Sequence, residues 1–212
     1  MSNHPSPHAP LDGPGAAPVI LAPGIEIFVG LGGNLGGHHA ICARFDRAVG
    51  ALEAELASGR ARRSSIYQSE PVGPVTRQPR FLNAVVSFAL GRAMTPNTLL
   101  DTILAIEVRL GRVRNPAEPK GPRKVDLDLL FAGDCVATGP GLSLPHPRMI
   151  ERAFVLRPLA ELVGVDWPMP GFARTVAECL AGPEPAAQSA GVRLYVPPGG
   201  ADGRYSRSAW PR

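Results

Sequence analysis

The sequence predicts an α+β fold of the split βαβ, ferredoxin-like type, an antiparallel sheet with helices packed on it. Apolar periodicity orders the middle of the chain as strand, helix, strand, strand, helix, strand. The 212 residues are 44% hydrophobic and 19% charged, which is enough apolar material for one sizeable core. We therefore predict a disordered Pro/Gly-rich tail over 1–24, one globular domain over 25–182, and a mostly irregular C-terminal extension over 183–212.

The first half of the domain alternates strands with one helix. Residues 25–31 are β-branched and apolar and lead into a glycine-rich loop, which is typical of a buried strand. Strands are also predicted over 62–67 and 81–90, on either side of a loop broken by prolines. The helix between the first two strands has apolar residues at three- and four-residue spacing, namely Ile41, Phe45, Ala48, Leu52 and Leu56.

The second half begins with a helix that Thr95 and Pro96 start and Gly111 ends. A basic loop follows, and residues 125–131 form the clearest strand of the chain. A proline-bounded loop over 142–148 and a helix over 151–162, interrupted by Pro158, complete the core. Residues 192–196 could form one more strand.

Composition excludes several classes of protein. The three cysteines, Cys42, Cys135 and Cys179, are scattered and form no CxxC pair, which favours reduced thiols in the cytoplasm. We find neither a signal peptide nor a membrane-spanning stretch. The net charge of +4 is too diffuse to indicate nucleic acid but suits a polyphosphate ligand. We expect small-molecule substrates, no nucleic-acid or membrane partner, and a monomer.

The sharpest chemical feature is the pair Asp126 and Asp128. Strand alternation predicts both carboxylates on one face, about 7 Å apart, with Val125, Leu127, Leu129 and Phe131 on the other. Two carboxylates on a mostly buried strand repel each other, and a divalent cation removes that repulsion. Mg²⁺ prefers one or two carboxylates together with substrate phosphates. The pair therefore indicates a metal site, against the alternative of two solvated aspartates.

A cluster of cations directly precedes this strand. Arginines bind phosphate oxygens with two parallel donors, and glycine and proline around them favour a loop that closes over a ligand. Phosphoryl transfer needs such positioning and charge neutralisation. The cluster comprises Arg112, Arg114, Lys120, Arg123 and Lys124.

Other candidate residues are less specific. His146, held between two prolines, could bind phosphate or handle a proton, although a lone loop histidine is usually structural. The glycines of residues 30–37 fit no phosphate-loop motif. Phe81, Asn83 and Phe154 would be interpreted as core and cap residues on physical grounds alone.

Taken together, the motifs resemble the 6-hydroxymethyl-7,8-dihydropterin pyrophosphokinase family of folate synthesis, in family order from about residue 26 to 181. The most specific block is Gly121-Pro122-Arg123 with Asp126-Leu127-Asp128-Leu129-Leu130. The remaining blocks are Gly32-Gly33-Asn34-Leu35, Ser65 to Gly73, Gln78 to Val85, Ile106-Glu107, Gly111-Arg112, and Leu144 to Met149 with Glu151 to Leu156.

The resemblance implies that the domain transfers pyrophosphate from ATP, the co-substrate, to the pterin hydroxymethyl group and releases AMP. It further implies two Mg²⁺ ions held by Asp126 and Asp128. Its catalytic residues would be Arg112, Arg123, Asp126 and Asp128. ATP would be bound by Glu107, Arg114, His146 and Arg152. The pterin would be bound by Ser69, Val72, Phe81, Asn83 and Phe154, with both phenylalanines stacking on the ring.

Four positions depart from the family pattern. Gly33 replaces a serine, which would remove a hydroxyl next to the pterin pocket. Phe81 replaces a tyrosine of some members, Lys120 stands at an often aromatic position, and Pro119 at an often basic one. The alternatives are a degenerate pterin-binding paralogue, a DxD-type nucleotidyl- or glycosyltransferase, and an RNA-binding ferredoxin-like domain. The last lacks the RNP1 pattern of glycines and aromatics.

Overall fold

The computed structural model describes residues 18–73, 77–113 and 121–196. The helices are α1 (Gly37–Glu55), α2 (Pro96–Arg109), α3 (Ala153–Val163), α4 (Val176–Leu180) and α5 (Pro183–Gln188), with the 3₁₀ helices η1 (Pro147–Glu151) and η2 (Ser189–Gly191). The strands are β1 (Glu26–Gly33), β2 (Arg62–Arg63), β3 (Tyr67–Ser69), β4 (Phe81–Ala89), β5 (Asp126–Ala132), β6 (Ala137–Gly139), β7 (Leu142–Leu144), β8 (Pro168–Met169), β9 (Arg174–Thr175) and β10 (Arg193–Leu194).

The main sheet confirms the predicted α+β fold. Its strand order is β10-β3-β4-β1-β5, with β2 also paired to β4, and every pair is antiparallel. Strand β1 therefore lies between β4 and β5, the strands that precede and follow α2 in the chain, as the split βαβ pattern requires. Its register sets Gly30 opposite Asp128 and Gly32 opposite Asp126.

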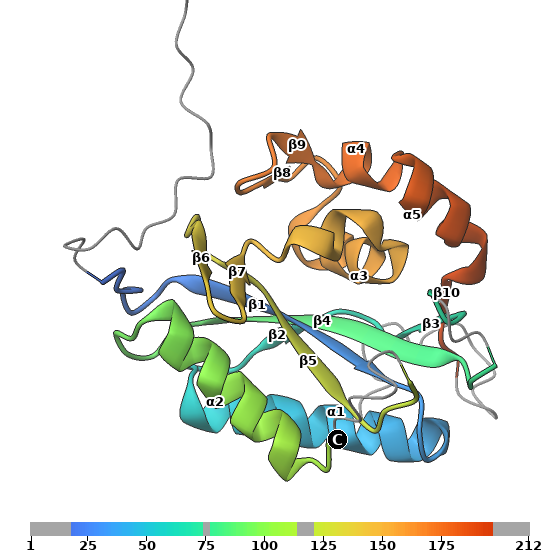
Figure 1. The fold of residues 1–212 in the computed structure, drawn as a ribbon, viewed down its shortest axis with the longest axis horizontal. Helices are drawn as coiled ribbons and strands as arrows, with labels where there is room; N and C mark the ends of the chain where they lie inside the picture. The colour runs from blue at the N-terminus through green and yellow to red at the C-terminus, as the bar shows by residue number, and fades with distance from the viewer. Residues whose placement is uncertain (1–17, 74–76, 114–120, 197–212) are drawn as a thin grey trace, which may run out of the picture.

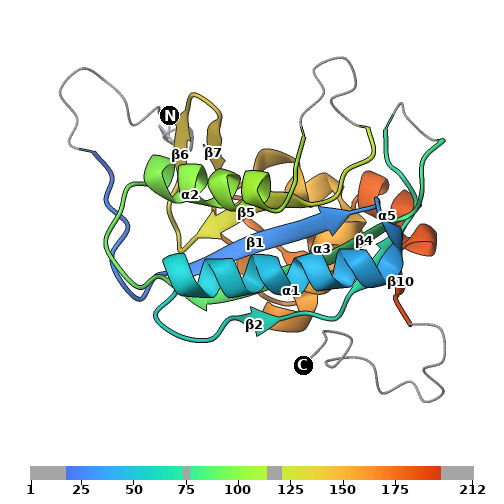
Figure 2. The ribbon, with the colours of Figure 1, turned by 90° about the horizontal axis from the view of Figure 1, so that it is seen from below.

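Helices cover both faces of this sheet (Figures 1 and 2). Helices α1 and α2 lie side by side on one face, and α3, α4 and α5 lie over the other. Each face has its own apolar core: Phe45 of α1 belongs to one buried cluster, and Leu156 of α3 belongs to another. Helix α2 starts as predicted, since the Thr95 hydroxyl accepts the Thr98 N–H at 3.1 Å and Pro96 follows it.

Strand β5 differs from the predicted alternation at its far end. Phe28 pairs with Phe131, but the next residue of β1, Val29, pairs with Leu129, so β5 carries one extra residue, Leu130. This bulge turns Phe131 over to the α3 side, while Leu129 stays on the α1–α2 side. The prediction that Phe131 shares a face with Leu129 is therefore wrong.

Two element boundaries also differ from those predicted. The single strand expected over 62–67 is two short strands, β2 and β3. The helix expected over 151–162 begins only at Ala153, because Glu151 still belongs to η1. Pro158 lies inside α3 without ending it, and it is buried.

Both predicted flanks contain packed residues. Leu21 is 1% exposed and forms an antiparallel bridge with Met94, so the last residues of the predicted tail belong to the core. Within the predicted irregular extension, α5, η2 and β10 form, and β10 confirms the further strand suspected over 192–196. The packed domain is therefore longer at both ends than 25–182.

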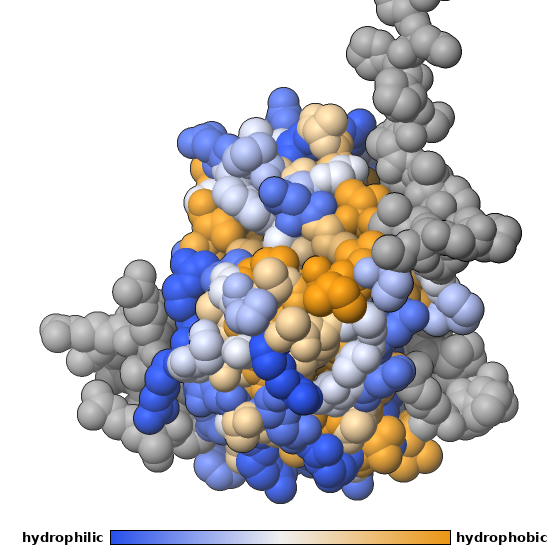
Figure 3. Space-filling view, turned by 90° about the vertical axis from the view of Figure 1, so that its left-hand side faces the viewer, coloured by the Kyte–Doolittle hydropathy of each residue, from blue (hydrophilic) through white to orange (hydrophobic). Residues whose placement is uncertain are grey.

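On the face of Figure 3, apolar side chains gather near the middle, with polar side chains around them. Exposed apolar residues of the described chain are distributed over several elements, for example Ile20, Val108 and Val165. None of the helices in the described part is both long enough and apolar enough to cross a membrane.

Candidate active site

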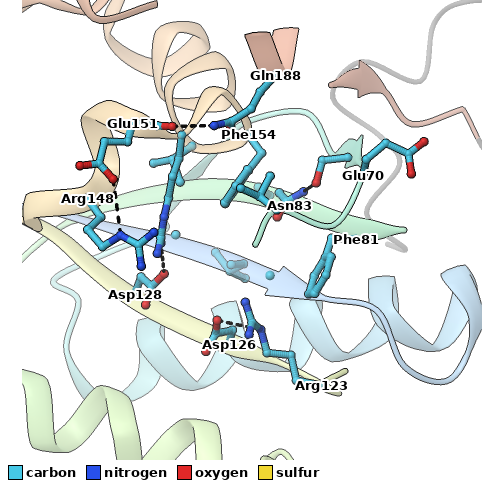
Figure 4. A pocket seen from close by; sticks show the side chains of 18 of the residues that line it. Glu70, Phe81, Asn83, Arg123, Asp126, Asp128, Arg148, Glu151, Phe154 and Gln188 are labelled. Carbon is cyan, nitrogen blue, oxygen red and sulfur yellow. Dashed lines mark hydrogen bonds and ion pairs between the residues drawn. The ribbon is translucent and has the colours of Figure 1, made fainter. Parts of the chain in front are cut away.

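A cavity of about 460 Å³ lies between the sheet and the η1–α3 segment (Figure 4). Its walls come from seven parts of the chain: the end of β1, the β3–β4 region, the segment between α2 and β5, the start of β5, η1, the first turn of α3, and α5. Ten of the predicted site residues line it together, namely Ser69, Val72, Phe81, Asn83, Arg112, Arg123, Asp126, Asp128, Arg152 and Phe154.

The two aspartates form one wall of this cavity. Asp126 pairs with Arg112 (Oδ1 to Nη2, 3.3 Å) and with Arg123 (Oδ2 to Nε, 2.9 Å). Asp128 pairs with Arg152 (Oδ2 to Nη1, 3.5 Å). Both carboxylates therefore face the cavity among cations that could also meet phosphate oxygens.

The glycines of β1 keep the sheet surface beside the aspartates open. A Cβ on Gly30 would lie 3.8 Å from the Asp128 Cβ, and one on Gly32 would lie 3.7 Å from the Asp126 Cβ. A larger side chain at either position would project between the carboxylates and the rest of the cavity. This is the close approach that the glycines of the predicted loop provide.

Electrostatics around Asp128 favour a bound cation. Burial, and then repulsion by Asp126, raise the pKa of the Asp128 carboxyl, while His146, Arg152 and Arg123 lower it. A divalent cation would compensate both unfavourable effects. In the described residues no cluster of three or more His, Cys, Asp or Glu side chains could hold a metal. Two carboxylates opening onto a cavity nevertheless fit Mg²⁺, which takes its other ligands from phosphate and water.

Asn34 fixes the backbone that carries Arg123. Its Oδ1 accepts the Arg123 N–H at 2.8 Å, and the Arg123 carbonyl accepts the N–H groups of Asn34 and Leu35. Its Nδ2 donates to the Pro79 carbonyl at 3.0 Å and to Gln78 Oε1 at 3.1 Å. Asn34 is buried, so one side chain joins the glycine-rich loop, the basic loop and the start of β4.

Asn34→Ala is expected to lower the free energy of unfolding by about 2–3 kcal/mol, because it leaves several buried polar groups without partners. Urea denaturation measures this change. The control is Asn97→Ala on the exposed surface of α2, for which a change below about 0.5 kcal/mol is expected. Equal stabilities of the two variants would contradict a joining role for Asn34.

The opposite wall is aromatic and polar. Phe81 and Phe154 both line the cavity, and the Asn83 Nδ2 donates to Ser69 Oγ at 3.0 Å, which fixes the orientation of the amide. The Arg123 guanidinium lies 5.0 Å from the centroid of the Phe81 ring. A fixed amide between two aromatic rings is suited to a flat heterocycle with polar edges.

Two predicted residues lie behind the wall rather than on it. Glu107 is 1% exposed, and its Oε1 accepts the Leu127 N–H at 3.0 Å while Oε2 lies 3.9 Å from Arg112 Nε. His146 donates its backbone N–H to the Leu130 carbonyl. Burial lowers the pKa of the His146 imidazole, against the raising effect of Asp128. The predicted residues Arg114, Pro119 and Lys120 lie outside the described residues.

Gly33 does not face the cavity. A Cβ there would lie 2.7 Å from the Lys124 carbonyl oxygen and 3.4 Å from Ile41, on the side of α1. A serine side chain at this position would therefore start on the α1 side of the sheet and not in the cavity. A serine at this position would require the Lys124 backbone to move.

Sequence reasoning missed six polar or charged residues that line the cavity: Glu70, Gln78, Arg148, Glu151, Glu184 and Gln188. Four of them stand inside motif blocks that the sequence already singled out. Glu184 and Gln188 belong to α5, and no pattern in the sequence connects that helix with the cavity.

The fold and the cavity fit one class of protein, a transferase in which paired carboxylates and arginines would handle a polyphosphate beside an aromatic acceptor pocket. Residues 28–164 match the family model described as 7,8-dihydro-6-hydroxymethylpterin-pyrophosphokinase (HPPK). The chain belongs to this family.

Curated relatives agree with this assignment. The 2-amino-4-hydroxy-6-hydroxymethyldihydropteridine pyrophosphokinase of Synechocystis sp. is 39% identical over 152 residues, which are 72% of this chain and 73% of the relative. The protein of the same name from Methylorubrum extorquens is 40% identical over 75% of this chain and 94% of the relative. The folate synthesis bifunctional protein of Arabidopsis thaliana is 37% identical, but the match spans only 28% of its length.

A solved structure shares the fold. The crystal structure of wild-type Plasmodium falciparum HPPK-DHPS with pterin and p-hydroxybenzoate superimposes with a TM-score of 0.58 at 12% identity. The match covers 81% of this chain and 45% of that one. At this identity the likeness supports the fold alone.

Proposed function

We infer from family membership that this protein is a pyrophosphokinase of folate biosynthesis. We propose that it transfers pyrophosphate from ATP to the hydroxymethyl group of 6-hydroxymethyl-7,8-dihydropterin and releases AMP. The observation that carries the proposal is a single cavity with two unlike walls. The acidic and basic wall suits a triphosphate, and the aromatic wall suits a pterin.

On the phosphate side, we assign Asp126 and Asp128 as the residues that would hold two Mg²⁺ ions. Bound there, Mg²⁺ would neutralise triphosphate charge and orient the β-phosphorus for in-line attack. Arg112 and Arg123 flank Asp126, and they would neutralise the charge that develops on the transferred group. Arg152 reaches the cavity beside Asp128 and would bind ATP phosphate.

Glu107 and His146 support the ATP side from behind the wall. Glu107 holds the backbone of β5 at Leu127 and lies against Arg112, so it would orient both an arginine and the aspartate strand. His146 lies close enough to Asp128 to influence its pKa. Arg114 completes the proposed ATP-binding set.

On the pterin side, Phe81 and Phe154 would stack on the two faces of the ring. Asn83, oriented by Ser69, would hydrogen-bond its polar edge, and the segment from Ser69 to Val72 would add mostly backbone contacts. This wall would hold the hydroxymethyl group toward Arg123 and Asp126. Positioning of this kind supplies much of the rate in phosphoryl transfer.

The test is an assay with Mg-ATP and 6-hydroxymethyl-7,8-dihydropterin in which the nucleotide product is identified by chromatography. AMP that forms only with pterin and Mg²⁺ is the expected result. ADP would indicate γ-phosphoryl transfer and contradict the proposal. Pterin binding without any product would favour a degenerate pterin-binding paralogue.

The proposal includes a monomeric enzyme that acts in the cytoplasm on small molecules. The scattered exposed apolar residues support the monomer, and the three widely spaced cysteines support a reducing compartment. Light scattering coupled to size exclusion tests the monomer, and a dimeric mass would contradict it.

A further inference from the structure

Gln188 joins the C-terminal helix α5 to the active-site cavity. It is the last residue of α5 and lies outside the segment 28–164 that matches the family model. Figure 4 shows its side chain directed at Glu151, at the top of the cavity that Phe154 and Asp128 also line.

The Gln188 amide binds the backbone on both sides of Arg152. Its Nε2 donates to the Glu151 carbonyl at 2.8 Å, and its Oε1 accepts the Ala153 N–H at 3.2 Å. The two peptide groups that flank Arg152 are thus held by one planar side chain. The direction in which the Arg152 side chain leaves the backbone depends on both.

These bonds replace a helix cap that the local sequence does not provide. Arg152 is the N-cap of α3, and its side chain makes no capping hydrogen bond. The N–H of Ala153 is one of the first donors of the helix, which have no partner within it, and Ala153 is fully buried. Without Gln188 this donor has no partner among the described residues.

The backbone that Gln188 binds carries one residue of the proposed ATP site, Arg152, and one of the proposed pterin site, Phe154. The Arg152 Nη1 lies 3.5 Å from Asp128 Oδ2, and its guanidinium lies 5.8 Å from the centroid of the Phe154 ring. Phe154, in the first turn of α3, is the proposed stacking residue. A small rotation of this turn would therefore move a phosphate ligand and an aromatic wall at once.

The segment after Gln188 is fixed to the domain independently. Strand β10 pairs with β3, and Val192 is buried against Tyr67 and Ala153. Arg157 Nη1 also donates to the Val192 carbonyl at 3.1 Å. Gln188 is therefore presented from a rigid support, which a positioning residue needs.

We propose that Gln188 is a positioning residue for the transfer reaction, which holds Arg152 and Phe154 in the geometry that binds the two substrates. The inference rests on the proposed function, because it assumes that these two residues meet ATP and pterin. It assigns to the C-terminal extension a part in the substrate site.

The test compares Gln188→Met, which keeps the length of the side chain without its hydrogen bonds, with Gln188→Glu, which keeps the acceptor for Ala153. The control is Ala187→Met, one residue earlier on the exposed side of α5. We would measure the pterin Kd by fluorescence, KM and kcat for AMP formation, and hydrogen exchange of the Ala153 amide by NMR.

For Gln188→Met we expect the pterin Kd and KM to rise about tenfold, with a smaller change in kcat at saturation and faster Ala153 exchange. Gln188→Glu should recover part of the affinity, and Ala187→Met should match the wild type. Wild-type affinity in Gln188→Met, or an equal loss in Ala187→Met, would overturn the inference.

The same experiment separates this inference from the proposed function. A wild-type protein that makes no AMP contradicts the proposed function. The exchange rate of the Ala153 amide still reports on its hydrogen bond to Gln188 in that case. If Gln188→Met does not fold, Gln188→Glu decides the question. The inference then requires that Gln188→Glu has a higher pterin Kd than the wild type, because the Glu151 carbonyl has lost its hydrogen-bond donor.

Discussion

Asp128→Asn and Asp126→Asn are each expected to lower kcat for AMP formation by on the order of 10³-fold. An amide has the shape of the carboxyl group but not its charge, so it cannot balance a divalent cation next to a triphosphate. Steady-state kinetics with saturating Mg-ATP and pterin measure the loss. Turnover close to the wild type in either variant would contradict the assignment of this pair as the metal ligands.

A stability measurement distinguishes this loss from misfolding. Burial and Asp126 raise the pKa of Asp128 above its unfolded value, so the folded protein binds the proton more tightly than the unfolded chain. The ionised carboxylate therefore destabilises the metal-free protein increasingly as pH rises above the ordinary carboxyl range. In EDTA at neutral pH, Asp128→Asn should be at least as stable as the wild type.

The matched control is Asp134→Asn, an exposed aspartate in the turn directly after β5. It removes the same charge from the same part of the chain without touching the cavity. Both kcat and stability should remain near the wild type, since surface substitutions change stability by less than about 0.5 kcal/mol. A comparable loss of kcat in this variant would mean that net charge, and not the pair, is responsible.

The sequence predicts correctly those helices and strands whose bounds depend on neighbouring residues. Helix α2 starts at Pro96 because Thr95 caps it and the proline fixes the first turn, and both residues are visible in the sequence. The alternation of β5 placed Asp126 and Asp128 together correctly, because the bulge comes after them. Phe131 was placed on the wrong face because the extra residue in β5 arises from pairing with β1, which periodicity does not show.

Contacts between distant segments could not be predicted in the same way. Leu21 forms a bridge with Met94, and Gln188 forms hydrogen bonds with Ala153 and Glu151, which precede it by 35 and 37 residues. No pattern in the sequence around Leu21 or Gln188 indicates these contacts. Asn34 stood in a motif block, but its hydrogen bond to Arg123 spans 89 residues. The family resemblance identified ten of the residues that line the cavity, and only the structure separated those on its wall from Glu107 behind it.

Arg123→Ala is expected to lower kcat by about 10²–10³-fold, the second large effect. Arg123 lies between the two halves of the site, since its Nε is 2.9 Å from Asp126 Oδ2 and its guanidinium lies over the Phe81 ring. That is where a phosphorus held by the aspartates and a hydroxyl held by the phenylalanines would meet. Its charge would therefore act mainly on the transition state, so kcat should fall more than the pterin affinity.

Arg123→Lys tests whether charge alone is sufficient. A lysine keeps one positive charge but lacks the planar fork that reaches Asp126 and a phosphate oxygen together. We expect it to recover only part of the lost kcat, with a pterin Kd close to that of Arg123→Ala. The control is Arg47→Ala, where an exposed guanidinium on α1 bonds only to its own helix among the described residues. Full activity in Arg123→Lys would show that the site needs a charge there and not the guanidinium geometry, and full activity in Arg123→Ala would remove Arg123 from the proposed mechanism.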